Sequence, residues 1–438
     1  MKILVLSQYW YPENGVPQRR WQWLTDILQQ AGHEVTVITP PPHYKRKLST
    51  TQWFDQQGFR AAKKYEVGPL GERIVRCGFF PSGRSLTKRI FNQASVAAAM
   101  LVAVFGKTPA LRDYHPDLII GTVPALPTAS VTWLAAVKYK VPYIIDLRDA
   151  WPALFRESND WNTGTGKSSL REKVLSKGAF QTLTCVTEQS LNKVLGHASG
   201  IITTSKLLEE QLHGERKTTT AGQLRRVTTV RNVFPEGTSY RKESTKIVDK
   251  GRAPRSLRVL YAGTVGRAQK LHNAIEAARL AKNAGVDIEF AIVGDGASWT
   301  DIRDIAPTVN FPLRVEHSTT PDQLVEYYSW ADTALVHLTD WDALRFAIPS
   351  KIYELFTVGL HISGVVQSEA ADLIRQLDAG SVIAPEDPHA LAALWQQLAA
   401  DSQRLAVSDA GRQWVIEQRE YVAPRQLLEI VERSAAQQ

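Results

Sequence analysis

Short apolar runs rich in β-branched residues alternate with amphipathic stretches along most of the 438 residues. Most of these runs are bounded by Gly, Pro or Asp, which is typical of parallel strands buried on both faces of a sheet. In the first half of the chain the pattern predicts strands at 2–7, 34–39, 74–79, 117–121, 143–148, 200–205 and 227–231. In the second half it predicts strands at 257–263, 288–293, 313–317, 333–338, 361–366 and 381–384.

The first predicted helix has the clearest period. Leu24, Ile27, Leu28 and Ala31 follow one another at spacings of three and four residues, which places them on one buried face. Gly32 precedes the strand EVTVIT and is expected to end the helix. Strands that alternate with helices in this way predict an α/β fold with parallel sheets.

The alternating pattern lapses at 236–256, where EGTSYRKESTKIVDKGRAPRS is polar, charged and without period. We expect this stretch to link two domains, since 438 residues are too many for one ordinary core. The pattern therefore predicts two Rossmann-like domains, each a doubly wound parallel sheet. Ligands are expected at the carboxyl ends of the strands, where the two domains face a cleft.

The charge balance points to an anionic partner. The chain has 52 Lys and Arg against 44 Asp and Glu, a formal net charge of +8. A nucleotide, a phosphate-bearing substrate, an acidic lipid or a nucleic acid would suit this charge. The sequence offers no compact basic helix and no basic strand interleaved with aromatic residues, so we expect no nucleic-acid partner.

Cysteine usage and the N-terminal sequence favour a cytoplasmic protein. Cys77 and Cys185 are far apart and lack CxxC spacing, which fits a reducing compartment without disulfides or a cysteine metal site. The apolar run in MKILVLSQYW is too short for a signal peptide.

The segment 91–106, FNQASVAAAMLVAVFG, is nearly all small or apolar, but it is shorter than the roughly 20 residues that span a bilayer. Two interpretations stay open: a buried helix against the sheet, or a helix in the membrane interface. The second would dock the chain on an acidic inner leaflet as a peripheral protein. It draws on nearby basic residues, which are Lys45, Arg46, Lys47, Arg60, Lys63, Lys64, Arg84, Lys88 and Arg89.

The opening motif YPENGVPQRR joins a predicted strand to a predicted helix. Gly15 would let the backbone approach a ligand beside the unpaired N–H groups of the helix start. Arg19 and Arg20 are expected to add positive potential there. A simple tight turn would use the same glycine.

A second junction, YAGTVGRAQKL, places Gly266, Arg267 and Lys270 before a helix. The two cations form a clamp suited to a diphosphate. Cations at a helix start are unfavourable to its dipole unless an anion binds there. This favours an anion site over solvated charges.

Two further motifs follow predicted strands. Gly294 and Asp295 in IVGDG are compatible with a nucleotide fold or with a plain turn, and the GxGxxG dinucleotide fingerprint is absent. In PSKIYELF, Ser350 is expected to cap a helix. Glu354, one turn later, could accept two hydrogen bonds from a ribose diol.

Six motifs in order resemble those of family 4 glycosyltransferases of the GT-B fold, and they cover essentially the whole chain. They are YPENGVPQRR, GHEVTVIT, DLRDAWP, YAGTVGRAQKL, IVGDG and PSKIYELFTVGL…SEAADLI. The chain is most similar to the branch that builds bacterial O-antigen, capsule and exopolysaccharide units, including amino-sugar transferases. The resemblance implies a retaining transfer from a nucleotide-sugar, expected to be a UDP-sugar, to a glycan or polyprenyl-diphosphate-linked acceptor. It implies neither a cofactor nor a bound metal.

The same resemblance divides the chain and assigns roles. It implies an acceptor-binding domain at 1–240, a nucleotide-sugar-binding domain at 241–420 and a helix at 421–438 that packs back on the N-terminal domain. Arg267 and Lys270 would hold the donor diphosphate and stabilise charge on the leaving group. The residues expected to bind the donor are Gly15, Gly266, Gly294, Asp295, Ser350, Lys351 and Glu354.

Two positions depart from the family pattern. The first Glu of its Glu-x7-Glu pair falls on Phe346, and Arg148 replaces the His that often lies near the sugar. Asp149 is the remaining catalytic candidate, since it could hydrogen-bond the sugar or the acceptor. The residues expected on the acceptor side are Arg19, Arg148 and Trp151.

Two alternative functions stay open. A sugar-nucleotide epimerase of the same fold would act on the donor alone. A non-catalytic partner, suggested by Phe346 and Arg148, would bind a nucleotide-sugar without turning it over.

Overall fold

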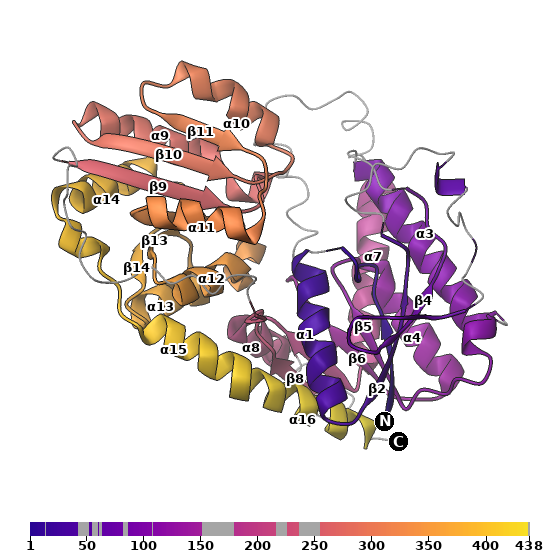
Figure 1. The fold of residues 1–438 in the computed structure, drawn as a ribbon. Coiled ribbons are helices and arrows are strands. Elements are labelled where there is room, and N and C mark those ends of the chain that lie inside the picture. Colours follow the sequence, from indigo (N-terminus) through magenta and orange to yellow (C-terminus); the bar gives the residue numbers. More distant parts are fainter. Residues whose placement is uncertain are drawn as a thin grey trace. The chain divides into compact units, whose positions relative to one another are not determined.

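The chain divides into two compact units (Figure 1). The computed structural model describes residues 1–13, 15–42, 52–54, 60, 64–81, 86–106, 108–150, 179–215, 226–235 and 255–436. Of these, the N-terminal unit contains the residues up to 150, from 179 to 234 and from 420 onward, and the C-terminal unit contains the others. The division falls close to the boundary expected at 240. Residues 236–254 of the linker expected at 236–256 lie outside the described residues.

In the described part of the N-terminal unit, one sheet has the strand order β3-β4-β2-β1-β5-β6-β7-β8. All neighbours pair in parallel except β3 and β4. Ile3 of β1 pairs with Val35 on one side and Leu118 on the other, so the sheet grows outward from β1 in both directions. The strands are β1 (Lys2–Leu6), β2 (Glu34–Thr39), β3 (Glu66–Val67), β4 (Arg73–Arg76), β5 (Leu118–Thr122), β6 (Tyr143–Asp146), β7 (Gly200–Thr203) and β8 (Arg226–Thr229).

Helix α1 lies on one face of this sheet, and α3, α4 and α7 lie on the other (Figure 1). The helices are α1 (Val16–Gln30), α3 (Leu86–Phe105), η1 (Pro109–Leu111), α4 (Pro127–Tyr139), α7 (Ala179–His197), α8 (Lys206–Glu215) and α16 (Ala423–Ala435). The terminal helix α16 packs against α1 and the strands from β5 to β8. A Cβ added to Gly200 of β7 would lie 2.8 Å from Ser434 Oγ of α16, so this glycine permits the close approach.

The C-terminal unit has a parallel sheet in the order β11-β10-β9-β12-β13-β14. Its strands are β9 (Ser256–Ala262), β10 (Asp287–Val293), β11 (Leu313–Glu316), β12 (Thr333–His337), β13 (His361–Val365) and β14 (Gly380–Ile383). Its helices are η4 (Arg267–Gln269), α9 (Leu271–Asn283), α10 (Trp299–Ile305), η5 (Ala306–Thr308), α11 (Pro321–Trp330), η6 (Asp342–Phe346), α12 (Ser350–Val358), α13 (Ser368–Gln376), α14 (Pro388–Ala400), η7 (Ser402–Leu405) and α15 (Ala410–Glu417), with a π-helical turn at Gln418–Val422. Phe290 and Trp395 meet in its core with ring centroids 6.0 Å apart.

The hydrophobic pattern predicted the sheets well. Every predicted strand coincides with an observed strand, with shifts only at the ends. The antiparallel edge strand β3 was not predicted, because its two exposed residues form no apolar run. Helix α1 ends before Gly32, whose φ of +80° confirms the predicted stop. The prediction for Ala31 was wrong, since it lies beyond the helix and is exposed.

The apolar segment 91–106 forms most of α3. Val96 and Met100 are fully buried, as the buried-helix interpretation predicts. The opposite side of the same helix nevertheless exposes Phe91, Val102 and Phe105. In the ranges that the structure describes, no helix is long and apolar enough to cross a membrane.

The buried His361 of β13 makes the stability of the C-terminal unit sensitive to acid. Burial lowers its pKa from 6.5 to about 4. Since the unfolded chain binds a proton at the higher pKa, stability is fully present above pH 6.5 and falls toward pH 4, by up to about 3 kcal/mol. We expect His361→Gln to lose less stability than the wild type over this window in thermal melts. The exposed His389→Gln is the control, and equal acid sensitivity of all three proteins would exclude His361 as the cause.

Candidate active site

Two loops at the carboxyl edge of the C-terminal sheet pack directly against each other. Gly263 N donates to Val293 O at 3.0 Å, and Val265 N donates to Asp295 O at 2.9 Å. A Cβ on Gly294 would lie 1.7 Å from Gly263 O, so no larger residue fits there. The structure therefore joins the motifs YAGTVGRAQKL and IVGDG, which the sequence indicated separately.

The loop after β9 leads straight into α9. Gly266 is the N-cap of η4, and Arg267, the first residue of η4, is exposed. Lys270 follows η4 with a left-handed φ of +35° and is itself the N-cap residue of α9. Its ammonium group is thus carried at the positive end of a thirteen-residue helix.

The Lys270 ammonium donates to a carboxylate that sequence reasoning missed, that of Glu386. Glu386 also accepts from Asn273 Nδ2 at 3.0 Å and from Thr339 Oγ1 at 2.6 Å. Desolvation alone would raise the pKa of Glu386, but the hydrogen bonds from Lys270, Thr339 and Asn273 lower it to about 2. Glu386 is therefore a fixed negative charge beside the predicted clamp.

A second group joins α11 to α12. Glu354 is buried and accepts from Tyr328 Oη and from Lys351 Nζ, the latter at 2.5 Å. The structure thus brings Lys351 and Glu354 together, while the buried Tyr328 was not predicted. The predicted cap was wrong: α12 begins at Ser350 itself, with Pro349 at the N-cap and no side-chain cap. The proline ring fixes the backbone where a capping side chain would otherwise act.

Asp295 has a neighbour from the next strand. The carboxylate lies 2.6 Å from His317 Nδ1 and accepts the Ser318 N–H at 3.0 Å. Partial burial would raise the pKa of Asp295, but the hydrogen bonds from Ser318 and His317 outweigh it and lower the pKa. The His317 ring stacks on Trp299 with centroids 4.0 Å apart. The His317 ring is exposed, whereas the Trp299 ring is half-buried and also has the Arg303 guanidinium 5.3 Å from its centroid.

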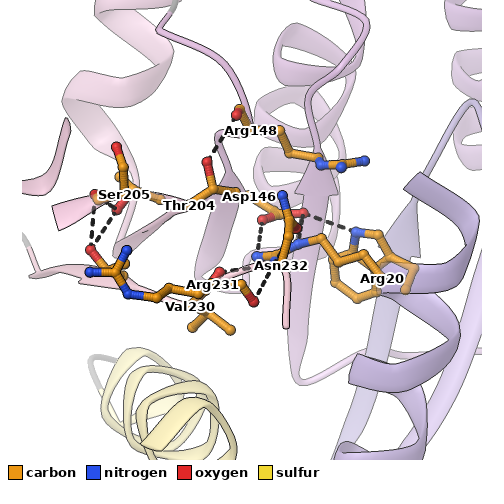
Figure 2. Close-up of polar contacts among 11 residues, drawn as sticks. Arg20, Asp146, Arg148, Thr204, Ser205, Val230, Arg231 and Asn232 are labelled. Atoms are coloured by element: carbon orange, nitrogen blue, oxygen red, sulfur yellow. Dashed lines mark hydrogen bonds and ion pairs between the residues drawn. The ribbon is translucent and has the colours of Figure 1, made fainter. Parts of the chain in front are cut away.

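In the N-terminal unit, a buried network surrounds Arg20 (Figure 2). Its guanidinium forms an ion pair with Asp146 at 2.9 Å, with both side chains fully buried. It also donates to Val230 O at 2.8 Å and to Asn232 Oδ1 at 3.0 Å, while Trp21 donates to Asp146 at 3.0 Å. The expectation that Arg20 adds surface potential was wrong, because Asp146 neutralises it in the core.

Arg148 follows β6 beside this network. Among the described residues, its Nε and Nη1 atoms are buried without a hydrogen-bond partner. Burial lowers the pKa of Arg148 to about 10. The negative charge of Asp146 raises this pKa, and the positive charge of Arg20 lowers it further. Figure 2 shows the Arg148 side chain extending away from its own backbone contact with Thr204. Asp149 is exposed, and Trp151 lies outside the described residues.

Gly15 is the N-cap of α1, with φ −113°. Any residue adopts this extended backbone, and a Cβ would meet only the flexible end of Gln18, at 2.6 Å from its Oε1. The fold itself therefore does not require glycine here. Arg19 lies one turn into α1, with its guanidinium 4.8 Å from the centroid of the Phe234 ring. The roles expected of Gly15 and Arg19 stay predictions.

Of the residues that were not predicted, some carry a signal in the sequence and one does not. Glu386 and His317 both stand at the carboxyl ends of predicted strands, where a polar residue is a site candidate in a parallel sheet. Tyr328 carries no such signal, because it is one aromatic residue inside an amphipathic helix. Its hydrogen bond to Glu354 depends on packing between α11 and α12.

The sequence matches known families over most of its length. Residues 15–232 match the glycosyl transferase 4-like domain, and residues 256–401 match the glycosyl transferases group 1. The putative colanic acid biosynthesis glycosyl transferase WcaI of Escherichia coli K12 is 26% identical over 387 residues, 86% of each chain. The amylovoran biosynthesis glycosyltransferase AmsK of Erwinia amylovora is 29% identical over 216 residues, 47% of this chain and 51% of that protein.

Solved structures share the two-domain architecture. Sucrose-phosphate synthase from Thermosynechococcus elongatus matches with a TM-score of 0.66 at 15% identity, over 100% of both chains. Anabaena HepE, solved with UDP and glucose, matches with a TM-score of 0.61 at 14% identity, over 99% of both chains. The expected GT-B fold is thus confirmed.

The Arg20–Asp146 pair is expected to dominate the stability of the N-terminal unit. Arg20→Met leaves the Asp146 carboxylate buried without its counter-charge, so we expect a loss of about 3–5 kcal/mol. The exposed Arg73→Met, whose guanidinium lies 5.4 Å from the centroid of the Tyr65 ring in the same unit, should cost about 1 kcal/mol or less. Urea unfolding curves of both variants test this, and equal losses would contradict it.

Proposed function

Because this chain belongs to the glycosyltransferases, with a glycosyl transferase 4-like domain followed by a group 1 domain, we propose that it uses a nucleotide-sugar, most simply a UDP-sugar. The acceptor would be a glycan or a polyprenyl-diphosphate-linked sugar of a cell-surface polysaccharide. Relatives named for colanic acid and amylovoran biosynthesis support the product class. A structural neighbour solved with UDP-glucose supports the donor class.

The observation that carries this proposal is the loop between β9 and α9. Arg267 and Lys270 lie directly before the first turn of α9, and the loop packs closely against Gly294. Two cations and a helix start are suited to a diphosphate. In the proposed reaction they stabilise the charge that develops as the nucleoside diphosphate leaves.

The other donor residues take roles around this clamp. Glu354 would bind the ribose hydroxyls, and Asp295 would border the base, where the exposed His317 ring, stacked on Trp299, offers a flat surface. Lys351 and the backbone at Ser350 would lie near the phosphates or the transferred sugar.

The proposed transfer retains anomeric configuration and needs no bound metal. The acceptor oxygen attacks the anomeric carbon from the face that the diphosphate leaves, and the acceptor proton passes to a departing phosphate oxygen. Asp149 would hydrogen-bond the sugar or acceptor, with Arg19, Arg148 and Trp151 on the acceptor side and Gly15 at the donor.

Calorimetric titration with UDP, GDP, ADP and NAD in EDTA tests the clamp. We expect one nucleoside diphosphate to bind, and Arg267→Ala to weaken it about tenfold or more, which corresponds to at least about 1.4 kcal/mol. Arg279→Ala removes a cation from the exposed side of α9 and should leave binding unchanged. Binding of NAD alone, or undiminished binding by Arg267→Ala, would contradict the proposal.

Product analysis separates transfer from epimerisation. A transferase consumes the donor only in proportion to the glycosylated acceptor. Incubation of the protein with the nucleotide-sugar alone should therefore leave the donor sugar unchanged, whereas an epimerase would convert it. Binding without turnover, with every acceptor offered, would point to the non-catalytic alternative.

We also propose that the N-terminal unit docks on an acidic membrane surface through α3 and α4. Exposed apolar residues recur along one side of α3 at helical spacing, and they continue onto α4. The largest are Phe91 (55% exposed), Val102 (64%), Phe105 (53%) and Val137 (60%). A shallow cavity of about 500 Å³ between the two helices is lined by Leu101, Val102, Phe105, Gly106 and Leu134.

Charge selects the partner for this apolar surface. Neither α3 nor α4 contains an acidic residue. Exposed lysines lie on the same elements: Lys88 near the start of α3, and Lys138 and Lys140 at the end of α4. The exposed Lys193 lies 5.5 Å from the Trp133 ring centroid of α4. Apolar side chains accompanied by lysines fit an anionic lipid surface. Arg60 and Lys64 are also exposed; the side chains of Lys45, Arg46, Lys47, Lys63, Arg84 and Arg89 lie outside the described residues.

Flotation with vesicles tests the docking. We expect binding to vesicles rich in phosphatidylglycerol at low salt and little binding to neutral phosphatidylcholine. Val102→Asp should weaken binding about tenfold, since it places a carboxylate in the apolar surface. Val67→Asp, an equally exposed valine on the edge strand β3, is the matched control. A stable dimer that Val102→Asp dissociates, without vesicle binding, would assign the surface to a second copy instead.

A further inference from the structure

Two residues with left-handed backbones meet beside the proposed donor clamp. Lys270 has φ +35° in the loop after β9, and Glu386 has φ +63° in the turn after β14. Residues other than glycine adopt this conformation at a cost in free energy. Both positions lie in the C-terminal unit, and the two side chains form an ion pair. The fold thus holds two unfavourable backbones where one charge pair joins two loops.

The Glu386 carboxylate is bound on both oxygens. Oε2 accepts from Lys270 Nζ and from Asn273 Nδ2, which lies in the first turn of α9, and Oε1 accepts from Thr339 Oγ1. Thr339 N in turn donates to Ala268 O at 2.8 Å. The Glu386 carboxylate therefore already lies at the N-terminus of α9. It is bound by the Lys270 ammonium group, which in the proposed function binds the diphosphate.

The pair is accessible enough to exchange partners. The Lys270 side chain is 40% exposed and that of Glu386 is 33% exposed. A diphosphate arriving at α9 would meet the Lys270 ammonium together with its carboxylate partner. If both anions stay on the one ammonium group, the carboxylate and the phosphates are held close together and repel each other.

We propose that Glu386 is an internal competitor of the donor diphosphate for Lys270. This inference rests on the proposed function of the clamp. In the donor-free protein, Glu386 holds the ammonium at the start of α9. The diphosphate displaces the carboxylate when the donor binds, and Glu386 recaptures Lys270 as the nucleoside diphosphate leaves. Glu386 therefore lowers affinity for the nucleoside diphosphate and speeds its release.

Calorimetry of the full chain with UDP, GDP and ADP tests this competition. Glu386→Gln removes the charge but keeps the shape, so we expect it to tighten binding of the nucleoside diphosphate about threefold, the scale of a partly exposed ion pair. Glu386→Gly should do the same, since glycine accepts the positive φ. Glu276→Gln is the matched control: it removes a carboxylate that pairs with Arg279 on the exposed side of α9 and should change nothing.

A double-mutant cycle identifies the contact responsible. In a Lys270→Ala background, Glu386→Gln should have no effect, because the competitor has lost its target. Unchanged or weaker binding by Glu386→Gln and Glu386→Gly in the Lys270 protein would overturn the inference and leave Glu386 a positioning residue. Failure of the wild type to bind any nucleoside diphosphate would instead overturn the proposed function. Melting curves of each variant establish that it is folded.

Discussion

The N-terminal unit depends on one buried ion pair. Arg20 and Asp146 have no solvent exposure, and two charges taken out of water are costly unless every donor and acceptor is matched. Val230 O, Asn232 Oδ1 and the Trp21 indole complete the match. This set of contacts joins α1 to β6 and to the chain after β8. The ion pair therefore positions the start of α1 and the residues after β6, where acceptor-side residues are proposed.

The sheets were predictable because parallel strands are buried on both faces, and each buried strand is therefore a short apolar run in the sequence. The same rule could not find β3, which is exposed at the sheet edge. It also gave the wrong environment for Arg20, since nothing near Arg20 in the sequence reveals Asp146, which stands 126 residues later. Local pattern predicts which segments are buried; it does not predict which polar groups are buried with them.

The candidate site was predictable to a similar extent. Glycine motifs after strands marked two loops whose backbones do touch, and Gly294 fits because a Cβ would collide with Gly263 O. The cations Lys270 and Lys351 were also found, since they lie in those motifs or at a helix start. Their partners were not. Glu386 is 116 residues from Lys270 in sequence, and Tyr328 reaches Glu354 only through the packing of α11 on α12.

These partners change what the cations can do. Lys270 and Lys351 each contact a carboxylate in the C-terminal unit, so the positive charge facing a ligand is smaller than the number of cations suggests. A diphosphate would gain less from Coulomb attraction, and relatively more from backbone N–H groups at the start of α9. It would also exchange one anion for another at Lys270, so that the ammonium group stays paired while Glu386 keeps its hydrogen bonds from Asn273 and Thr339. Pairing of this kind suits an enzyme that must release a charged product as readily as it binds its donor.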